Sequence, residues 1–287
     1  MAGTMFNPVA RILVKRCFHN PIFIVGTGRS GTSVLLQALG KHPEILAMPG
    51  EAPLLTTFGS IGYLFEEAEE KNYYNASLRM PKDRLYEKLQ QMCFEIAGGD
   101  NYAIKTIIAS FKDGEGWPWK KKFWCCKTFP PQIIANGLRQ LFPAAKFVYI
   151  LRNGLDVVQS MTKFHGFHDR EFITHCASWN GSIDTYRYLL ACDVAIVVRH
   201  EELVAQPAEV FEKIFNLLGI ETHANSVKFV RTTLVHPLDM PNTQVSSAGK
   251  VLLARDPPYS KWSSEQKDVF KNICGEAMHE AGYEIPF

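Results

Sequence analysis

The sequence predicts an α/β protein with a single domain, in which helices flank a central parallel sheet. Short apolar runs rich in β-forming residues alternate with helical patterns, an order that is typical of parallel βαβ units. Several of these runs are almost continuously apolar, as expected for strands that helices cover on both faces. With 287 residues, 46% of them hydrophobic, the chain is long enough to bury one sizeable core.

Each element is assigned from its own run of residues. Strands are expected at 21–27, 44–48, 102–108, 123–128, 146–152 and 194–199. Helical spacing of apolar residues is found at 32–41, 84–97, 131–141, 154–163, about 170–191, 207–218 and 264–281. We expect a basic N-terminal extension at 1–20 and the folded domain at 21–287. In a sheet of this kind, ligands bind at the carboxyl ends of the strands.

Composition argues against several classes of protein and partner. The net charge is +2, from 31 basic and 29 acidic residues, so nucleic acid is not an expected partner. The seven cysteines lack the spacing of a disulfide framework or a zinc site, which indicates a reducing compartment. No apolar run reaches the length of about 20 residues that a transmembrane helix needs. We therefore expect a soluble, cytoplasmic protein; the basic residues of 1–20 leave organelle targeting or peripheral membrane contact as alternatives.

The stretch GTGRSGTS, residues 26–33, lies between an apolar run and a helical pattern. It has the spacing of the phosphate-binding loop GxxxxGK[ST], but Thr32 stands at the lysine position. Backbone N–H groups at the start of the helix favour an anion. The residues expected to bind phosphate are Thr27, Gly28, Arg29, Ser30, Gly31, Thr32 and Ser33. Without the lysine and a metal-holding aspartate, the loop fits one phosphate beside the Arg29 guanidinium and no metal; a P-loop kinase or NTPase is the alternative.

A second motif is FVYILRNGLDVVQSM, residues 147–161. An apolar strand ends at Arg152, a glycine follows, and a helix places Ser160 eight residues further on. Arginine suits bidentate contact with phosphate, and serine adds a donor. Taken alone, Arg152 beside Asp156 is equally consistent with a surface ion pair.

Together, these two motifs resemble those of the sulfotransferases that use 3′-phosphoadenosine 5′-phosphosulfate (PAPS). The resemblance runs from about Pro21 to Tyr283. It is closest to protein-tyrosine sulfotransferases and related bacterial enzymes, through HPEILAMPGE, CCKTFPP, SWNGSIDTY and RHEELVAQP. It implies a P-loop-like sulfotransferase fold similar to that of nucleoside triphosphate hydrolases, PAPS as co-substrate, and transfer of the sulfuryl group to an acceptor hydroxyl.

The resemblance also implies three catalytic residues. Glu51 matches the glutamate that removes the acceptor proton in the tyrosine-specific relatives. Lys127 ends an apolar strand and would stabilise the charge that grows on the leaving phosphate. Arg29 would assist it. Cytosolic phenol and steroid sulfotransferases instead carry a histidine directly after Lys-Thr, where this chain has Phe129.

For the nucleotide, the resemblance implies that Arg152 and Ser160 bind the 3′-phosphate. Lys261 matches a lysine that closes over the cofactor, and His200 stands where relatives place a tyrosine near the adenine. The chain has Phe164 where the tyrosine-specific enzymes carry another arginine, four residues after the serine. One phosphate contact is therefore expected to be missing or to come from Lys163.

The acceptor is less well defined by the sequence. The chain reads GEAPLL where the tyrosine-specific relatives carry an arginine three residues after their glutamate. We therefore expect a carbohydrate, lipid or small-molecule hydroxyl ahead of protein tyrosine. The oligomeric state is left open, with a homodimer among the options.

Overall fold

The computed structural model describes residues 19–51, 60, 81, 83–93, 120–129, 132–234 and 257–287. Two predictions of the sequence lie outside these residues: the strand at 102–108, and all but the last two residues of the extension at 1–20. Of the helix predicted at 84–97, the structure describes a helical part at 83–93.

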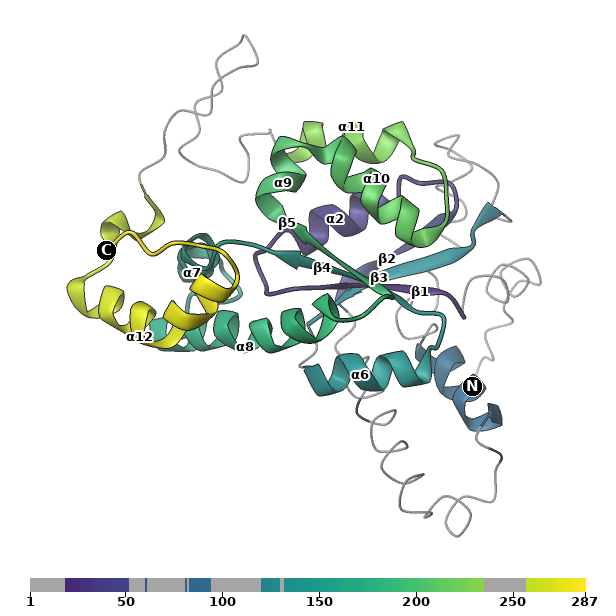
Figure 1. The fold of residues 1–287 in the computed structure, drawn as a ribbon, viewed down its shortest axis with the longest axis horizontal. Helices are drawn as coiled ribbons and strands as arrows, with labels where there is room; N and C mark the ends of the chain where they lie inside the picture. The colour runs from purple at the N-terminus through teal and green to yellow at the C-terminus, as the bar shows by residue number, and fades with distance from the viewer. Residues whose placement is uncertain are drawn as a thin grey trace, which may run out of the picture.

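In the described part of the chain, five parallel strands form the sheet, which confirms the predicted fold class (Figure 1). Their order is β2-β3-β1-β4-β5, with β1 in the middle. The strands span Pro21–Val25 (β1), Ile45–Glu51 (β2), Phe123–Thr128 (β3), Lys146–Leu151 (β4) and Ala195–Arg199 (β5). Val25 at the end of β1 lies opposite Thr128 of β3 and Tyr149 of β4, so the carboxyl ends of the three central strands meet at one edge.

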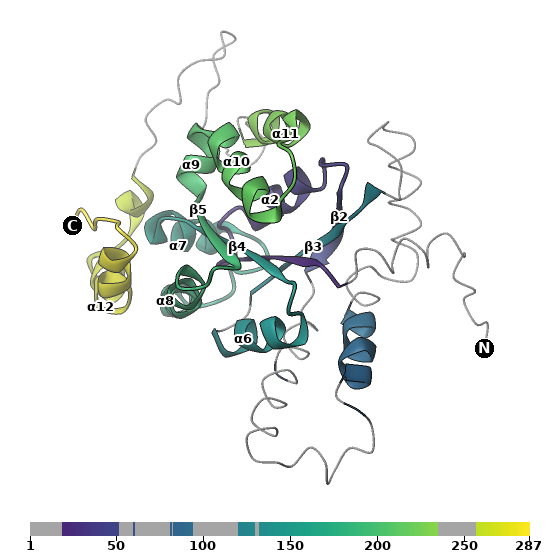
Figure 2. The same ribbon diagram turned by 45° about the vertical axis from the view of Figure 1, so that its right-hand side comes forward.

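Helices cover both faces of the sheet (Figures 1 and 2). One layer holds α2 (Thr32–Leu39), α9 (His200–Ala205), α10 (Pro207–Leu218) and α11 (Ala224–Leu234). The other holds α6 (Gln132–Leu141), α7 (Gly154–Lys163), α8 (Phe172–Leu190) and α12 (Ser264–Glu280). A 3-10 turn, η3 (Pro258–Lys261), precedes α12. The helices α9 and α11 were not among those predicted from the sequence.

The central parts of the strands are apolar because successive side chains enter opposite cores. In β1, Ile22 and Ile24 pack against the layer that contains α2 and α10, whereas Phe23 and Val25 pack against the layer that contains α6 and α8. All five residues of β1 are buried. Charged side chains such as Lys127 are thus found at the strand ends and in the loops that follow.

Local signals fix where several helices begin and end. Ser263 caps α12 by accepting a hydrogen bond from the Gln266 amide, and the Gln266 side chain returns a bond to Ser263. Pro207 stands in the first turn of α10, and Gly219 ends that helix with φ 65°.

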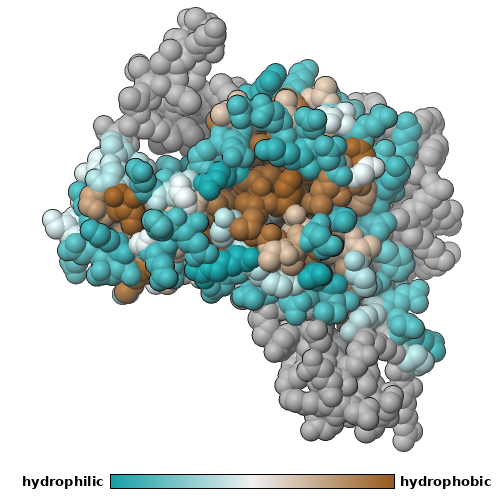
Figure 3. All heavy atoms as spheres, viewed as in Figure 1, coloured by the Kyte–Doolittle hydropathy of each residue, from teal (hydrophilic) through white to brown (hydrophobic). Residues whose placement is uncertain are grey.

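The strand β5 lies at one edge of the sheet. Its residues Ala195, Ile196 and Val197 are only partly buried, and hydrophobic side chains gather on this face between the two helical layers (Figure 3).

Among the described residues, no helix is long and apolar enough to cross a membrane.

Candidate active site

The loop between β1 and α2 needs glycine at two positions, where φ is positive and neighbouring atoms leave no room for a Cβ. Gly26 has φ 156°, and a Cβ there would lie 2.6 Å from the Ile150 carbonyl oxygen. Gly31 has φ 98°, and a Cβ there would lie 2.8 Å from Cδ2 of His200. Gly31 is the N-cap of α2 and provides no side-chain cap, so the N–H groups of the first turn face the loop and favour an anion.

Ser30 gives independent support for a ligand at this loop. Its hydroxyl is buried and has no hydrogen-bond partner among the described residues. A buried polar atom without a partner costs about 1–3 kcal/mol. A phosphate oxygen held by the loop would remove that cost.

Lys127 and Glu51 meet at the carboxyl ends of β3 and β2. The Nζ atom of Lys127 donates a hydrogen bond to Oγ of Ser33, in the first turn of α2, at 2.8 Å. Glu51 lies opposite Lys127 in the strand register, after an irregularity that begins at Ala47. The backbone therefore brings the predicted base and the predicted cation to one place.

Arg152, Ser160 and Arg29 form a second cluster. The Arg152 Nη1 atom donates to the backbone oxygen of Arg29 at 2.8 Å. The Arg29 Nε atom donates to Oγ of Ser160 at 3.2 Å, and its guanidinium carbon lies 3.9 Å from the centroid of the Phe164 ring. The structure thus joins the two sequence motifs, and it places the Arg29 guanidinium beside the residues predicted to hold the 3′-phosphate.

His200 and Lys261 stand on two short elements, α9 and η3, of which η3 packs beside α7. His200 begins α9 and packs against Gly31; burial, together with the charge of Arg152, lowers its pKa to about 3, so the ring is neutral at physiological pH. Lys261 is exposed at the end of η3. The next residue, Trp262, donates from Nε1 to Oε1 of Gln159 at 2.5 Å and so fixes this turn beside α7.

Sequence reasoning assigned no role to two residues of α8 that support both clusters. Trp179 donates from Nε1 to the Arg152 backbone oxygen at 3.1 Å. The Ser182 hydroxyl lies 2.6 Å from Oγ1 of Thr27, and Tyr149 donates to the Ser182 backbone oxygen at 3.0 Å. The segment SWNGSIDTY contains both residues, but their spacing indicates only that they share a helix face.

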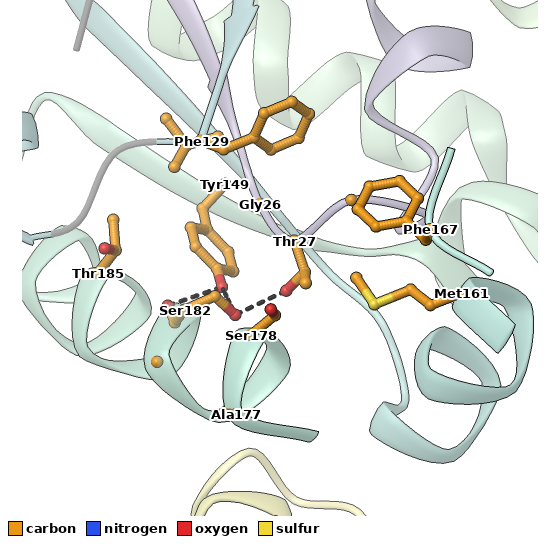
Figure 4. A pocket seen from close by; sticks show the side chains of 13 residues that line it. Gly26, Thr27, Phe129, Tyr149, Met161, Phe167, Ala177, Ser178, Ser182 and Thr185 are labelled. Atoms are coloured by element: carbon orange, nitrogen blue, oxygen red, sulfur yellow. Dashed lines mark hydrogen bonds between the residues drawn. The ribbon is translucent and has the colours of Figure 1, made fainter. Parts of the chain in front are cut away.

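A cavity of about 410 Å³ opens beside the start of the loop (Figure 4). It lies where β1, β3 and β4 end and where α8 passes. Aromatic, aliphatic and hydroxyl side chains line it, and none of its described lining residues is charged. The lining residues are Val25, Gly26, Thr27, Gly28, Phe129, Tyr149, Met161, Phe167, Ala177, Ser178, Gly181, Ser182 and Thr185.

No group of three or more histidine, cysteine, aspartate or glutamate side chains in the described part of the chain is arranged to hold a metal ion. The groups gathered at the loop are backbone amides, hydroxyls and the Lys127 ammonium.

Comparison with known proteins agrees with this geometry. A model of the sulfotransferase family matches residues 21–224, which include the loop, both strand-end clusters and α8. The chain belongs to the sulfotransferase family and is a transferase enzyme.

Two curated relatives are protein-tyrosine sulfotransferases by name. The one from Drosophila melanogaster is 25% identical over 207 residues, which are 69% of this chain and 38% of the relative. The protein-tyrosine sulfotransferase 1 of Danio rerio is 24% identical over 211 residues, which are 69% of this chain and 53% of the relative. The chain thus spans less than two thirds of the length of these relatives.

A solved structure shares the fold. The crystal structure of a mouse sulfotransferase complexed with PAP has a TM-score of 0.51 and 16% sequence identity, with coverage of 97% of this chain and 92% of that one. This likeness supports the P-loop-like architecture described above.

Proposed function

We propose that the enzyme transfers a sulfuryl group from PAPS to an acceptor hydroxyl. The observation that carries this proposal is the hydrogen bond between Lys127 and Ser33. It holds a cation at the amino end of α2, where the loop amides would bind the 5′-phosphate. The negative charge that develops on the departing 5′-phosphate would lie between Lys127 and the loop amides.

The reaction is an in-line displacement at sulfur. The acceptor oxygen attacks sulfur and forms a new S–O bond, while the bond from sulfur to the bridging oxygen of the 5′-phosphate breaks. The electron pair of that bond stays on the phosphate, which leaves as 3′-phosphoadenosine 5′-phosphate (PAP), and the acceptor proton passes to the Glu51 carboxylate. A general base increases the rate by about 10²- to 10⁴-fold. A fixed hydrogen-bond donor at the leaving oxygen stabilises the transition state by about 3–4 kcal/mol.

The second cluster would hold the 3′-phosphate. Arg152 and Ser160 supply the contacts predicted from the sequence, and Arg29 adds a third because it is already hydrogen-bonded to Ser160 and stacked on Phe164. In this proposal Arg29 takes the place of the arginine that the tyrosine-specific relatives carry at the position of Phe164. Lys261 and the neutral His200 would lie along the nucleotide.

Protein tyrosine is the second candidate acceptor, and the names of the curated relatives favour it. Its phenol oxygen could undergo the same sulfuryl transfer. The sequence GEAPLL, which lacks the arginine of those enzymes, argues against it.

Thermal unfolding with PAP in EDTA, compared with ATP and magnesium, tests the proposal. A ligand at 100 times its Kd increases the free energy of unfolding by about 2.7 kcal/mol. For a protein near this size, that increase raises Tm by roughly 5–10 °C. Lys127→Met should keep the PAP shift but lose transfer from labelled PAPS. Lys122→Met is the matched control, because Lys122 precedes the same strand and its side chain is 62% exposed. A Tm shift only with magnesium and ATP would refute the proposal and support a P-loop kinase or NTPase.

A further inference from the structure

Gly181 stands in the interior of α8 and lines the cavity. A Cβ built there would meet no atom within 4 Å. Glycine inside a helix costs about 0.5–1 kcal/mol relative to alanine. Here no close packing requires it, whereas a side chain would extend on the helix face that also carries Ser178, Ser182 and Thr185. The absence of a side chain keeps this wall of the cavity open.

Four of the hydroxyl groups that line the same cavity direct their hydrogens into the protein. Ser178 donates to the Thr174 backbone oxygen at 2.8 Å, and Ser182 donates to the Trp179 backbone oxygen at 2.7 Å. Tyr149 donates to the Ser182 backbone oxygen. Because the Ser182 proton is used in this way, Thr27 is the donor in the contact between Thr27 and Ser182. These four side chains therefore offer a ligand acceptor lone pairs but no free donor.

Apart from Thr185, the remaining side chains of the cavity are apolar. Phe129 lies at the end of β3, and Met161 and Phe167 lie on another side, close to the loop (Figure 4). The volume, about 410 Å³, is in the range of pockets that bury most of a small molecule. The hydroxyls of a monosaccharide placed here could donate to these oxygens, but their own oxygens would find no donor among the four side chains. A charged group would find no opposite charge among the described lining residues.

We propose that this cavity binds an uncharged acceptor that carries one hydroxyl on an apolar ring system wider than a single phenyl ring, and that Gly181 sets the width it accepts. The inference rests on the proposed sulfuryl transfer and specifies its substrate class. Phe129 and Phe167 contact the rings, while the reacting hydroxyl points along the loop toward Lys127.

The test uses two matched variants and four acceptors. Gly181→Leu fills the cavity wall, and Gly275→Leu is the control, since Gly275 also lies inside a helix, has no atom within 4 Å of a built Cβ, and does not line the cavity. The acceptors are phenol, 2-naphthol, glucose and a tyrosine-containing peptide, each with labelled PAPS. Thermal unfolding with PAP is recorded for every variant, and binding of 2-naphthol to the PAP complex is measured by calorimetry.

We expect the unmodified enzyme to prefer 2-naphthol in kcat/KM. Gly181→Leu should lower kcat/KM for 2-naphthol at least about tenfold more than for phenol, as a change of this size in an apolar pocket does. It should weaken 2-naphthol binding in parallel, while PAP binding and the Gly275→Leu enzyme stay unchanged. Faster transfer to glucose or the peptide, or equal losses for phenol and 2-naphthol, would overturn this inference and leave sulfuryl transfer intact. Loss of the PAP shift in the unmodified enzyme would instead refute the proposed function.

Discussion

Replacing Arg29 by glutamine is expected to weaken the binding of PAP selectively through its 3′-phosphate. The Arg29 guanidinium is hydrogen-bonded to Ser160 at 3.2 Å and lies 3.9 Å from the Phe164 ring, so it is held beside the predicted 3′-phosphate. A hydrogen bond from a charged donor contributes about 1.5–3 kcal/mol, which corresponds to a factor of about 10 to 150 in Kd.

The assay compares two ligands by calorimetry. Adenosine 5′-phosphate lacks the 3′-phosphate, so its Kd should change by less than about threefold in Arg29→Gln, because only screened long-range charge is lost. The Kd of adenosine 5′-phosphate divided by the Kd of PAP should therefore fall at least about threefold. Phe164→Leu removes only the ring beneath the guanidinium and should weaken PAP binding by about two- to fivefold, in line with a partly exposed cation–π contact of about 0.5–1 kcal/mol.

Two results would refute this assignment. Equal weakening of both ligands would place Arg29 on the 5′-phosphate. Unchanged PAP binding with a large loss of transfer from PAPS would make Arg29 a stabiliser of the leaving phosphate, as the sequence alone had led us to expect.

Three further predictions concern the base, the pH dependence and the support from α8. Glu51→Gln should reduce transfer by about 10²- to 10⁴-fold with PAP binding unchanged; activity close to that of the unmodified enzyme would remove Glu51 as the base. The pKa of His200 is about 3 in the folded protein against 6.5 when unperturbed, so the unfolded chain binds more protons between these values. The free energy of unfolding should therefore fall as the pH drops from 6.5 toward 3, by up to about 1.4 kcal/mol per pH unit from this residue. Chemical denaturation of His200→Gln should show a shallower decline, and parallel curves would contradict the assignment. Ser182→Ala should lower the free energy of unfolding by about 1–3 kcal/mol, because the Ser182 hydroxyl oxygen contacts both the Thr27 and the Tyr149 hydroxyl. The control Ser178→Ala, which removes a bond to its own helix, should cost less than about 1 kcal/mol in the same urea titration.

The elements predicted from the sequence are those whose signal is local. The run PIFIV, the glycines at 26 and 31 and the apolar spacing after Thr32 together indicate strand, loop and helix, and the structure has β1, the loop and α2 at these positions. The short helix α9 escaped prediction because six residues directly after a strand give too little periodicity to recognise.

The candidate site was predictable to the extent that it lies at strand ends. Lys127 and Arg152 could be placed there because each ends or follows an apolar run, and parallel strands carry their ends to one edge. Glu51 joined them only by resemblance to a family, and its register opposite Lys127 depends on an irregularity in β2 that no local pattern signals.

The sequence by itself determined the positions of the described strands and of most helices between them, the glycine-containing loop after β1 and the two basic positions at the strand ends, because these depend on periodicity and on glycine within short segments. Only the tertiary structure decided that Arg29 reaches Ser160, 131 residues away, and that Thr27 meets Ser182, 155 residues away. The same packing left the cavity open beside Gly181. Such contacts depend on how whole layers of helices pack on the sheet. The residues next to a side chain in the sequence do not show which distant residue it will contact.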